Sequence, residues 1–408
     1  MSDARPAPRR RAVLLSILSG ACALLLVLAI VRSPGEAFRA SLAGLQVWWQ
    51  TVFPGLLPPL MLAELLAASG LLHGLSAICE PVTRRLFRLP GAAGWAVFYG
   101  WISGLPTGAR EAARLRDEGL VRNRDLDTLL LLAHQPNPFV VILVVGSGFL
   151  QAPAYGWALV AGLWLSALIA GAVWARLPRS AKPDADHANS RATPVRPGAA
   201  VRRAREEDGR PFGRQISDAV TRAVGMLMAI GGLMMISSVL LRMIQIAWPQ
   251  SDAWLAVPGL YELHLGAYDA SRSPLFEASP VHAVSLLAAV LAWTGWSGLL
   301  QARAAFGPGP GFPWGRFIAG RLLQAALAVP LTFPLARAVQ NGWLSAALPA
   351  FGLPEWPLAD RAAGALPLPS GWTALSETTL ASAASIAVFL LLALLAAIIR
   401  PSKRRPRK

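Results

Sequence analysis

Two short polar segments interrupt apolar stretches of this sequence. The first, "SGLPTGAR" (Ser103–Arg110), directly follows the apolar run Gly94–Ile102, and the second, "HQPNPF" (His134–Phe139), lies between two more apolar runs. Proline lacks a backbone N–H and clashes with the preceding helical turn, so both segments are predicted to break helices. Inside a membrane, non-helical backbone is tolerated only where it is buried in protein or lines a polar cavity. The two breaks therefore predict a binding site.

The chemistry expected at these breaks is anion binding. A helix that begins after Pro106 or Pro138 presents free N–H groups and the positive end of its dipole, which suit a carboxylate or a phosphate. Arg110 adds a full positive charge. The alternative is that the prolines only kink helices and that His134 is a hydrogen-bonded packing residue. The substrate-binding residues predicted in this half of the chain are Ser103, Gly104, Pro106, Thr107, Gly108, Arg110, His134, Gln135, Asn137 and Pro138.

Three glutamates, Glu64, Glu80 and Glu262, lie in or near apolar stretches. A carboxylate within a membrane suits coupling to a proton or a sodium ion, or pairing with an arginine. For Glu64 the alternative is a structural pair with a neighbouring helix, and for Glu262, in "YELHLG", it is an external loop or interfacial turn. Ser297 and Gln301, in "WSGLLQ", are predicted to complete the substrate site from the second half of the chain.

The elements that must position these residues are membrane helices. The chain is 54% hydrophobic and 15% charged, and its mean hydropathy is +0.47. Crossing a bilayer takes about 20 apolar residues. With a re-entrant hairpin beginning at Gly94–Ile102, these runs predict an all-α polytopic membrane protein with about eight transmembrane helices. The predicted crossings are Ala12–Val31, Phe53–Leu72, Asp127–Leu150, Tyr155–Trp174, Ala219–Ile246, Val281–Leu300, Phe317–Val339 and Leu380–Ile399.

The formal net charge of +16 comes from basic clusters that flank apolar runs, at Arg5–Arg11, Arg176–Arg214 and Arg400–Lys408. By the positive-inside rule these clusters lie in the cytoplasm, together with both termini. Trp248–Pro280 is then expected outside. No nucleic-acid-binding motif accompanies the charge, so no nucleic-acid partner is expected. Contact with anionic lipid is a secondary use of the same residues.

Two membrane halves, 12–176 and 215–399, are separated by residues 177–214, which are predicted to be a disordered basic cytoplasmic linker. Residues 1–11 and 400–408 are basic cytoplasmic tails. Two pairs of segments predict that the halves are pseudo-repeats. They are Ser103–Ala113 with Ser297–Ala305, and Gly55–Leu66 with Gly232–Leu241.

Enzyme readings find no support in the sequence. Motifs of metalloproteases, serine hydrolases and P-loop proteins are lacking, since "GLPTGAR" has neither the spacing nor the Lys-Ser/Thr of a P-loop. We therefore expect no catalytic residue, no metal site and no cofactor.

The motifs together resemble the sporulation integral membrane protein YlbJ family. In the first half they are "WWQTVFPGLLPPLMLAELLAASGLL", "CEPVTRRLFRLPGAAG", "SGLPTGAREAARLRDEGL" and "NPF", and in the second half "IGGLMMISSVL", "GLYELHLG" and "GWSGLLQA". The resemblance covers roughly Trp48–Phe306. That family carries a nucleoside-recognition gate domain, which is similar to parts of concentrative nucleoside transporters.

The resemblance implies a protein of spore formation that moves dipicolinate across the mother-cell-derived, outer forespore membrane. This chain departs from the family at Leu105, where a tyrosine is usual, and at "HQPNP", where an Asn-Ala-containing run is expected. The positions that match family motifs are Glu64, Glu80, Pro81, Ser103, Gly104, Pro106, Gly108, Asn137, Pro138, Glu262, Ser297 and Gln301.

The function predicted from residues and resemblance together is transport of a small organic anion, with dipicolinate as the expected solute. One alternative is a transporter of nucleosides or related small solutes. Another is a non-transporting sporulation scaffold that recruits other proteins through its basic segments. The expected partners are the anionic solute, the lipid bilayer, a coupling proton or sodium ion, and either a second copy of the chain or other sporulation proteins.

Overall fold

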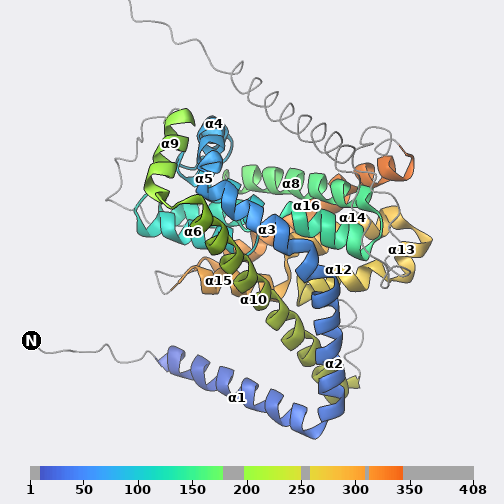
Figure 1. Cartoon of the computed structure of the whole chain (residues 1–408). Coiled ribbons are helices and arrows are strands. Elements are labelled where there is room, and N and C mark those ends of the chain that lie inside the picture. Colours follow the sequence, from blue (N-terminus) through green and yellow to red (C-terminus); the bar gives the residue numbers. More distant parts are fainter. Residues whose placement is uncertain (1–9, 178–196, 250–257, 308–311, 343–408) are drawn as a thin grey trace, which may run out of the picture.

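The computed structural model describes residues 10–177, 197–249, 258–307 and 312–342, and every secondary-structure element in these ranges is helical (Figure 1). The predicted all-helical class is confirmed. The first half contains α1 (Arg10–Arg32), α2 (Pro34–Val47), η1 (Trp48–Val52), α3 (Phe53–Ala68), α4 (Leu71–Leu86), α5 (Ala93–Ser103), α6 (Thr107–Asp117), η2 (Asn123–Asp125), α7 (Leu126–Ala133), η3 (Val140–Phe149) and α8 (Pro153–Trp174). The remainder contains α9 (Pro197–Asp208), α10 (Phe212–Ala247), η5 (Pro258–Leu260), α12 (Leu263–Ser271), α13 (Pro274–Ala278), α14 (Pro280–Trp293), α15 (Gly295–Ala305) and α16 (Trp314–Gln340).

Five helical stretches among the described residues are long and apolar enough to cross a membrane, and α1 adds a shorter apolar stretch, Ile17–Arg32. Four of the five coincide with predicted crossings, and the predicted crossing Leu380–Ile399 lies outside the described residues. The five stretches are Pro34–Ala68, Pro153–Trp174, Phe212–Ala247, Pro280–Ala305 and Trp314–Gln340.

Two predicted crossings have different bounds in the structure. The crossing predicted at Phe53–Leu72 begins much earlier, because α2, η1 and α3 run on without a break, and it ends before Gly70. Gly70 takes a left-handed conformation (φ 80°) that starts the turn into α4. The crossing predicted at Asp127–Leu150 is not one continuous helix, because α7 stops at Ala133 and helical structure resumes only after Asn137, mostly as the π-helix η3.

The predicted hairpin is formed by α5 and α6, which pack against each other. Arg88, before α5, and Arg122, after α6, line one surface hollow. Both ends of the α5–α6 pair therefore lie at the same end of the molecule. This is the geometry expected of a segment that enters and returns on one side.

The centre of the fold is a layer in which α14 and α8 both pack along α16, while a second layer is formed by α2 and α3 packed against α10 (Figure 1). Small residues let these helices approach closely, as is common in membrane proteins. Gly146 of η3 and Gly156 of α8 are an example. A Cβ atom on Gly146 would lie only 2.8 Å from the Cα atom of Gly156.

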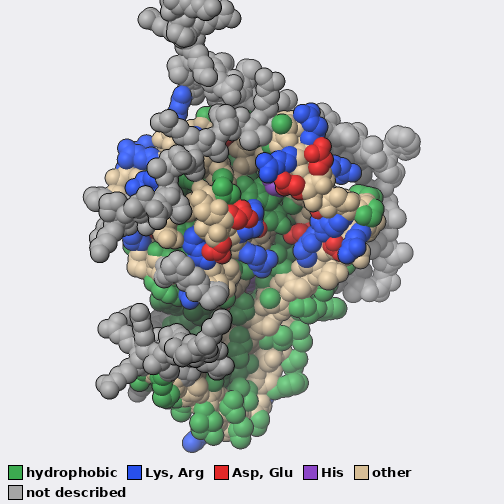
Figure 2. All heavy atoms as spheres, turned by 90° about the vertical axis from the view of Figure 1, so that its left-hand side faces the viewer, with side chains coloured by type: hydrophobic (Ala, Val, Ile, Leu, Met, Phe, Trp, Pro, Cys, Tyr) green, Lys and Arg blue, Asp and Glu red, His purple; other side chains and the backbone are tan. Residues whose placement is uncertain are grey.

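Charged and hydrophobic side chains are separated on the face shown in Figure 2. Charged side chains gather over its upper part, whereas green hydrophobic side chains predominate on the lower part, where α1, α2 and one end of α10 lie. Leu25 of α1 and Phe38 of α2 are each 65% exposed. Apolar surface of this extent is expected to contact lipid.

The prediction of a disordered linker at 177–214 is wrong for its second part. Residues Pro197–Asp208 form α9, whose Val201 packs where α4 and the turn before it carry Gly70 and Gly74. The alanines, arginines and glutamates of this segment favour a helix, and the two glycines leave room for Val201. Residues 178–196 lie outside the described residues.

Within Trp248–Pro280, η5 and α12 are packed inside the fold, so "YELHLG" is not the external loop or interfacial turn of the alternative. Glu262, Leu263 and Ala267 are at most 3% exposed, and α12 packs against α14 and η3. The leucine and alanine side chains on one face of α12 make this burial favourable. Because α12 is short and its flanking sequence resembles a loop, this apolar face is difficult to recognise from the sequence.

The predicted pseudo-repeat is not confirmed at its best-matching residues. Ser103 ends α5, whereas Ser297 lies near the beginning of α15. The shared tripeptide Ser-Gly-Leu therefore lies at the C-terminal end of one helix and at the N-terminal end of the other. It arises from similar composition rather than from equivalent positions.

Candidate functional site

Four interruptions of helices come together in the interior. The first, Gly104–Pro106, separates α5 from α6, and the second, His134–Asn137, separates α7 from the helical stretch 138–149. The third, Tyr261–Glu262, separates η5 from α12, and the fourth, at Thr294, separates α14 from α15. The first two confirm the breaks predicted from proline. The other two involve no proline.

Hydrogen bonds join the interruptions to one another. The Asn137 side chain donates from Nδ2 to the Ser103 carbonyl (3.3 Å), which connects the second interruption to the first. His134 Nε2 lies 3.1 Å from the carbonyl oxygen of Gly298, which connects the second to the helix after the fourth. The Ser297 N–H donates to the Tyr261 carbonyl (2.9 Å), which connects the fourth to the third.

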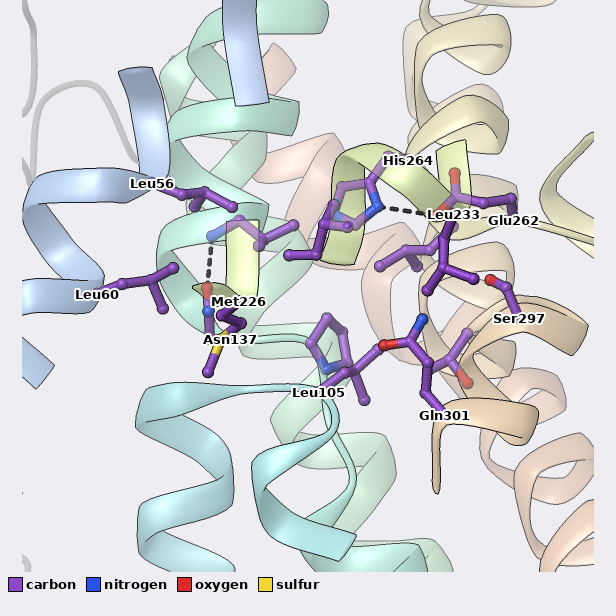
Figure 3. A pocket seen from close by; sticks show the side chains of 15 residues that line it. Leu56, Leu60, Leu105, Asn137, Met226, Leu233, Glu262, His264, Ser297 and Gln301 are labelled. Atoms are coloured by element: carbon purple, nitrogen blue, oxygen red, sulfur yellow. Dashed lines mark hydrogen bonds and ion pairs between the residues drawn. The ribbon is translucent and has the colours of Figure 1, made fainter. Parts of the chain in front are cut away.

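The interruptions surround a pocket of about 30 Å³. That volume holds one or two water molecules. Figure 3 shows Glu262 and Ser297 on one side of the pocket, with Gln301 below them, opposite Leu56 and Leu60 of α3. The polar lining is Asn137, Glu262, His264, Thr294, Ser297 and Gln301, and the apolar lining is Leu56, Leu60, Leu105, Pro136, Val140, Met226, Ile230, Leu233 and Leu263.

Helix N-termini face the pocket, and two of them are capped by side chains that line it. Asn137 Oδ1 accepts a hydrogen bond from the Val140 N–H (2.7 Å). Glu262 Oε2 accepts from the Leu265 N–H (2.7 Å), and its Oε1 lies 2.9 Å from His264 Nδ1. These caps use part of the positive potential of the two N-termini. The Glu262 carboxylate is itself an anion at the N-terminus of α12, where the helix dipole favours negative charge.

Three polar groups in the pocket wall have no hydrogen-bond partner among the residues that the structure describes. They are Thr294 Oγ1, Ser297 Oγ and His264 Nε2, and all three side chains are buried. A buried polar group without a partner costs about 1–3 kcal/mol. A polar solute that supplied partners would offset this cost. The pocket is therefore suited to a small solute with several hydrogen-bonding atoms.

The predicted site residues divide into a lining set and a supporting set. Of the residues predicted for the site, Asn137, Ser297, Gln301 and Glu262 line the pocket. The residues of the first interruption and its flanks lie behind the wall: Ser103, Gly104, Pro106, Thr107 and Gly108. Around the second interruption, His134, Gln135 and Pro138 likewise do not line the pocket. His134 and Gln135 are buried and hydrogen-bonded.

Arg110, predicted to bind the anion, lies outside the pocket. Arg110 is exposed and does not line the pocket. The neighbouring Ala109 and Ala112 occupy the buried face of α6, so the side chain between them points to the outside.

Two predicted carboxylates are also outside the pocket. Glu80 forms an ion pair with Arg84 one helical turn away on α4 (2.7 Å). Glu64 accepts a hydrogen bond from the Tyr99 hydroxyl (2.9 Å) and pairs with Arg222 of α10 (2.6 Å). The structural alternative for Glu64 is thus the arrangement observed.

Replacing Glu64 by glutamine is expected to lower the free energy of unfolding by about 1 kcal/mol, since Arg222 is 43% exposed and the pair is only partly buried. A double-mutant cycle with Glu64→Gln and Arg222→Gln, followed by thermal unfolding in detergent, measures the coupling. A coupling of several kcal/mol would contradict this estimate.

Two polar lining residues, His264 and Thr294, were not predicted from the sequence. His264 lies within the quoted motif "YELHLG", but nothing local shows that this segment turns inward. Thr294 has a left-handed conformation (φ 68°) between two helices. The pair Thr294-Gly295 after a long apolar run is a signal that could have indicated this break.

Comparison with known proteins agrees with the motifs. The chain is 28% identical over 352 residues to the sporulation integral membrane protein YlbJ of Bacillus subtilis (strain 168), a match that covers 78% of this chain and 82% of that protein. No protein-family model matches the chain, so the nucleoside-recognition gate domain stays a prediction. No solved structure matches it significantly. The length of the match and the order of the motifs support a relationship to the family of the sporulation integral membrane protein YlbJ.

Proposed function

We propose that this protein transports a small organic anion across a membrane and that the pocket between the four interruptions is the binding site. The observation that carries the proposal is the meeting of four helix breaks, two from each half of the chain, around one polar pocket. Broken helices within a membrane protein are typical of solute sites, because the freed backbone groups and helix ends bind the solute.

The pocket supports an anion with a flat apolar body. Helix N-termini favour negative charge, and the hydroxyls of Thr294 and Ser297 can donate to carboxylate oxygens. Leucines of α3 and α10 form the opposite wall. Dipicolinate combines a planar aromatic ring with two carboxylates, and the family resemblance implies this solute. We propose the outer forespore membrane as the location, with both termini in the cytoplasm.

Transport through this site requires movement. The pocket is too small for a ring with two carboxylates, so the polar wall and the apolar wall must separate before the solute enters. Closure around a solute is a common device of transporters and enzymes. Glu262 and His264 lie in the wall that would move, and they are the groups we propose for coupling to a proton or sodium ion.

A nucleoside is the second solute considered. Neutral donors and acceptors in the lining, above all the Gln301 amide, favour it. A non-transporting scaffold is the remaining alternative, and it predicts that changes in the pocket leave the protein's role intact.

The test is uptake of labelled dipicolinate into proteoliposomes, with uridine as the competing solute and protein-free liposomes as the control. Asn137→Ala is expected to lose about 1 kcal/mol of stability through the missing cap and to reduce dipicolinate flux at least tenfold. Asn123→Ala, at an exposed asparagine of η2, is the matched control and is expected to retain flux. Saturable uridine flux alone would favour the nucleoside. No flux of either solute under imposed proton and sodium gradients would overturn the proposal.

A further inference from the structure

Arg321 of α16 is a fully buried arginine at the centre of the fold. Its side chain is 0% exposed. The guanidinium donates from Nη1 to Gln324 Oε1 (3.0 Å) and to the Ala292 carbonyl (3.4 Å), and it lies 5.3 Å from the centroid of the Phe317 ring. Its Nε and Nη2 atoms have no hydrogen-bond partner among the described residues.

This arginine also lacks a carboxylate partner within the part of the chain that the structure describes. Two other arginines of this fold that are shielded from solvent have one. The buried Arg116 pairs with Asp117 (2.7 Å), and the half-buried Arg316, on the same helix as Arg321, pairs with Asp127. A buried charge without a counter-charge is strongly unfavourable in a protein interior. An ion pair within the described part of the chain therefore does not account for its presence.

The position of Arg321 connects it to the pocket. Ala292, whose carbonyl it contacts, is two residues before Thr294 in the pocket wall. Gln324, its other acceptor, forms a reciprocal pair of hydrogen bonds with Gln135 (3.1 and 2.8 Å), which directly precedes Pro136 in the wall. The guanidinium therefore lies directly behind the second and fourth interruptions.

We infer that Arg321 is the residue that makes the pocket select anions, through the positive charge that it holds behind the wall. The inference rests on the proposed transport function. A unit charge acts over several ångströms in an interior of low dielectric constant, without contact with the solute. Arg321 is thus a specificity-determining residue, and it takes the part that the sequence had assigned to Arg110.

Glu262 places a negative charge in the same wall. Its two carboxylate oxygens accept from the Leu265 N–H and contact His264, and the N-terminus of α12 supplies positive potential that reduces this charge. Arg321 has hydrogen bonds to neutral acceptors but no carboxylate beside it among the described residues. A solute carboxylate entering the pocket would provide a counter-charge.

The test compares dipicolinate with its neutral diamide, which has the same flat shape, in proteoliposomes and in thermal-shift binding to purified protein. The wild type is expected to prefer dipicolinate. Arg321→Gln is expected to reduce the preference, measured as the ratio of the two KM values, by about tenfold, whereas Arg321→Lys keeps it within a few-fold. Gln324→Glu preserves the size of the side chain but places a counter-charge on Arg321, so the same loss of preference is expected.

Arg337→Gln, at an exposed position of α16, is the matched control and should not change the ratio. An unchanged ratio in both Arg321→Gln and Gln324→Glu would overturn the assignment of Arg321 while leaving the transport proposal intact. If Arg321→Gln does not fold, Gln324→Glu decides alone. Wild-type protein that neither binds nor moves either compound would remove the transport proposal and this inference with it.

Discussion

Replacing Gly108 by alanine is expected to lower the free energy of unfolding by about 3 kcal/mol. A Cβ atom at this position would lie 2.0 Å from the carbonyl oxygen of Ala133, at the end of α7. Gly100 of α5 approaches the same oxygen, where a Cβ would be 2.1 Å away. Because the obstacle is backbone and not a mobile side chain, the α5–α6 hairpin would have to move off α7.

Thermal unfolding of the purified protein in detergent measures this effect. Gly225→Ala is the matched control, since no atom lies within 4 Å of a Cβ at that position in α10. Alanine is the better helix former by about 1 kcal/mol, so this control should unfold at the same or a higher temperature. Equal melting temperatures for Gly108→Ala and the wild type would show that the close approach of α6 to α7 is not maintained in the folded protein.

Replacing Glu262 by glutamine is expected to reduce flux of the solute by about 100-fold. The change keeps the volume of the side chain but removes the charge that α12 and His264 stabilise. The helix-dipole and charge-assisted hydrogen-bond contributions that hold this wall in place together amount to on the order of 3 kcal/mol, which corresponds to about 100-fold in the equilibrium between the ordered and the disordered wall. Flux is expected to fall with the population of the ordered wall. Initial rates of uptake into proteoliposomes provide the measurement.

Glu277→Gln, at an exposed position of α13, tests whether loss of any glutamate on this side of the chain has the same effect. This control is expected to retain wild-type flux. Flux of Glu262→Gln within twofold of the wild type, with normal folding, would mean that the pocket wall does not contribute to transport. Circular dichroism and gel filtration separate loss of function from loss of structure.

Local sequence accounts for much of the helical architecture. Pro106, Pro136 and Pro138 lack the N–H that a continuous helix needs, so the first two interruptions follow from the residues themselves. The apolar runs at Tyr155–Trp174 and Ala219–Ile246 likewise predict helices close to the observed bounds. Asn137 of the pocket lining could be chosen for the same reason, because a polar side chain next to such a break is expensive unless it binds something. Glu262, Ser297 and Gln301 could be chosen from the motifs of the second half that resemble the family.

The partners of each residue were decided only by tertiary structure. His134 meets the carbonyl of Gly298 across 164 positions of sequence, and Gln135 meets Gln324 across 189. Spacing along the chain carries no information about such contacts. For the same reason, the sequence allows Glu64 either a coupling or a structural role, and only the fold shows its pair with Arg222. Likewise, the sequence allows "YELHLG" to be an external loop.

The arginine that supplies positive charge near the pocket shows most clearly what the sequence determined and what the tertiary structure decided. The sequence by itself determined that the helices break and that the backbone groups freed at the breaks need polar partners, because both depend on covalent structure and on neighbouring residues. It placed the positive charge on Arg110, the arginine nearest to a break. The fold turned Arg110 outward on α6 and enclosed Arg321 behind the pocket, because the direction of a helical side chain depends on which face of the helix its neighbours cover.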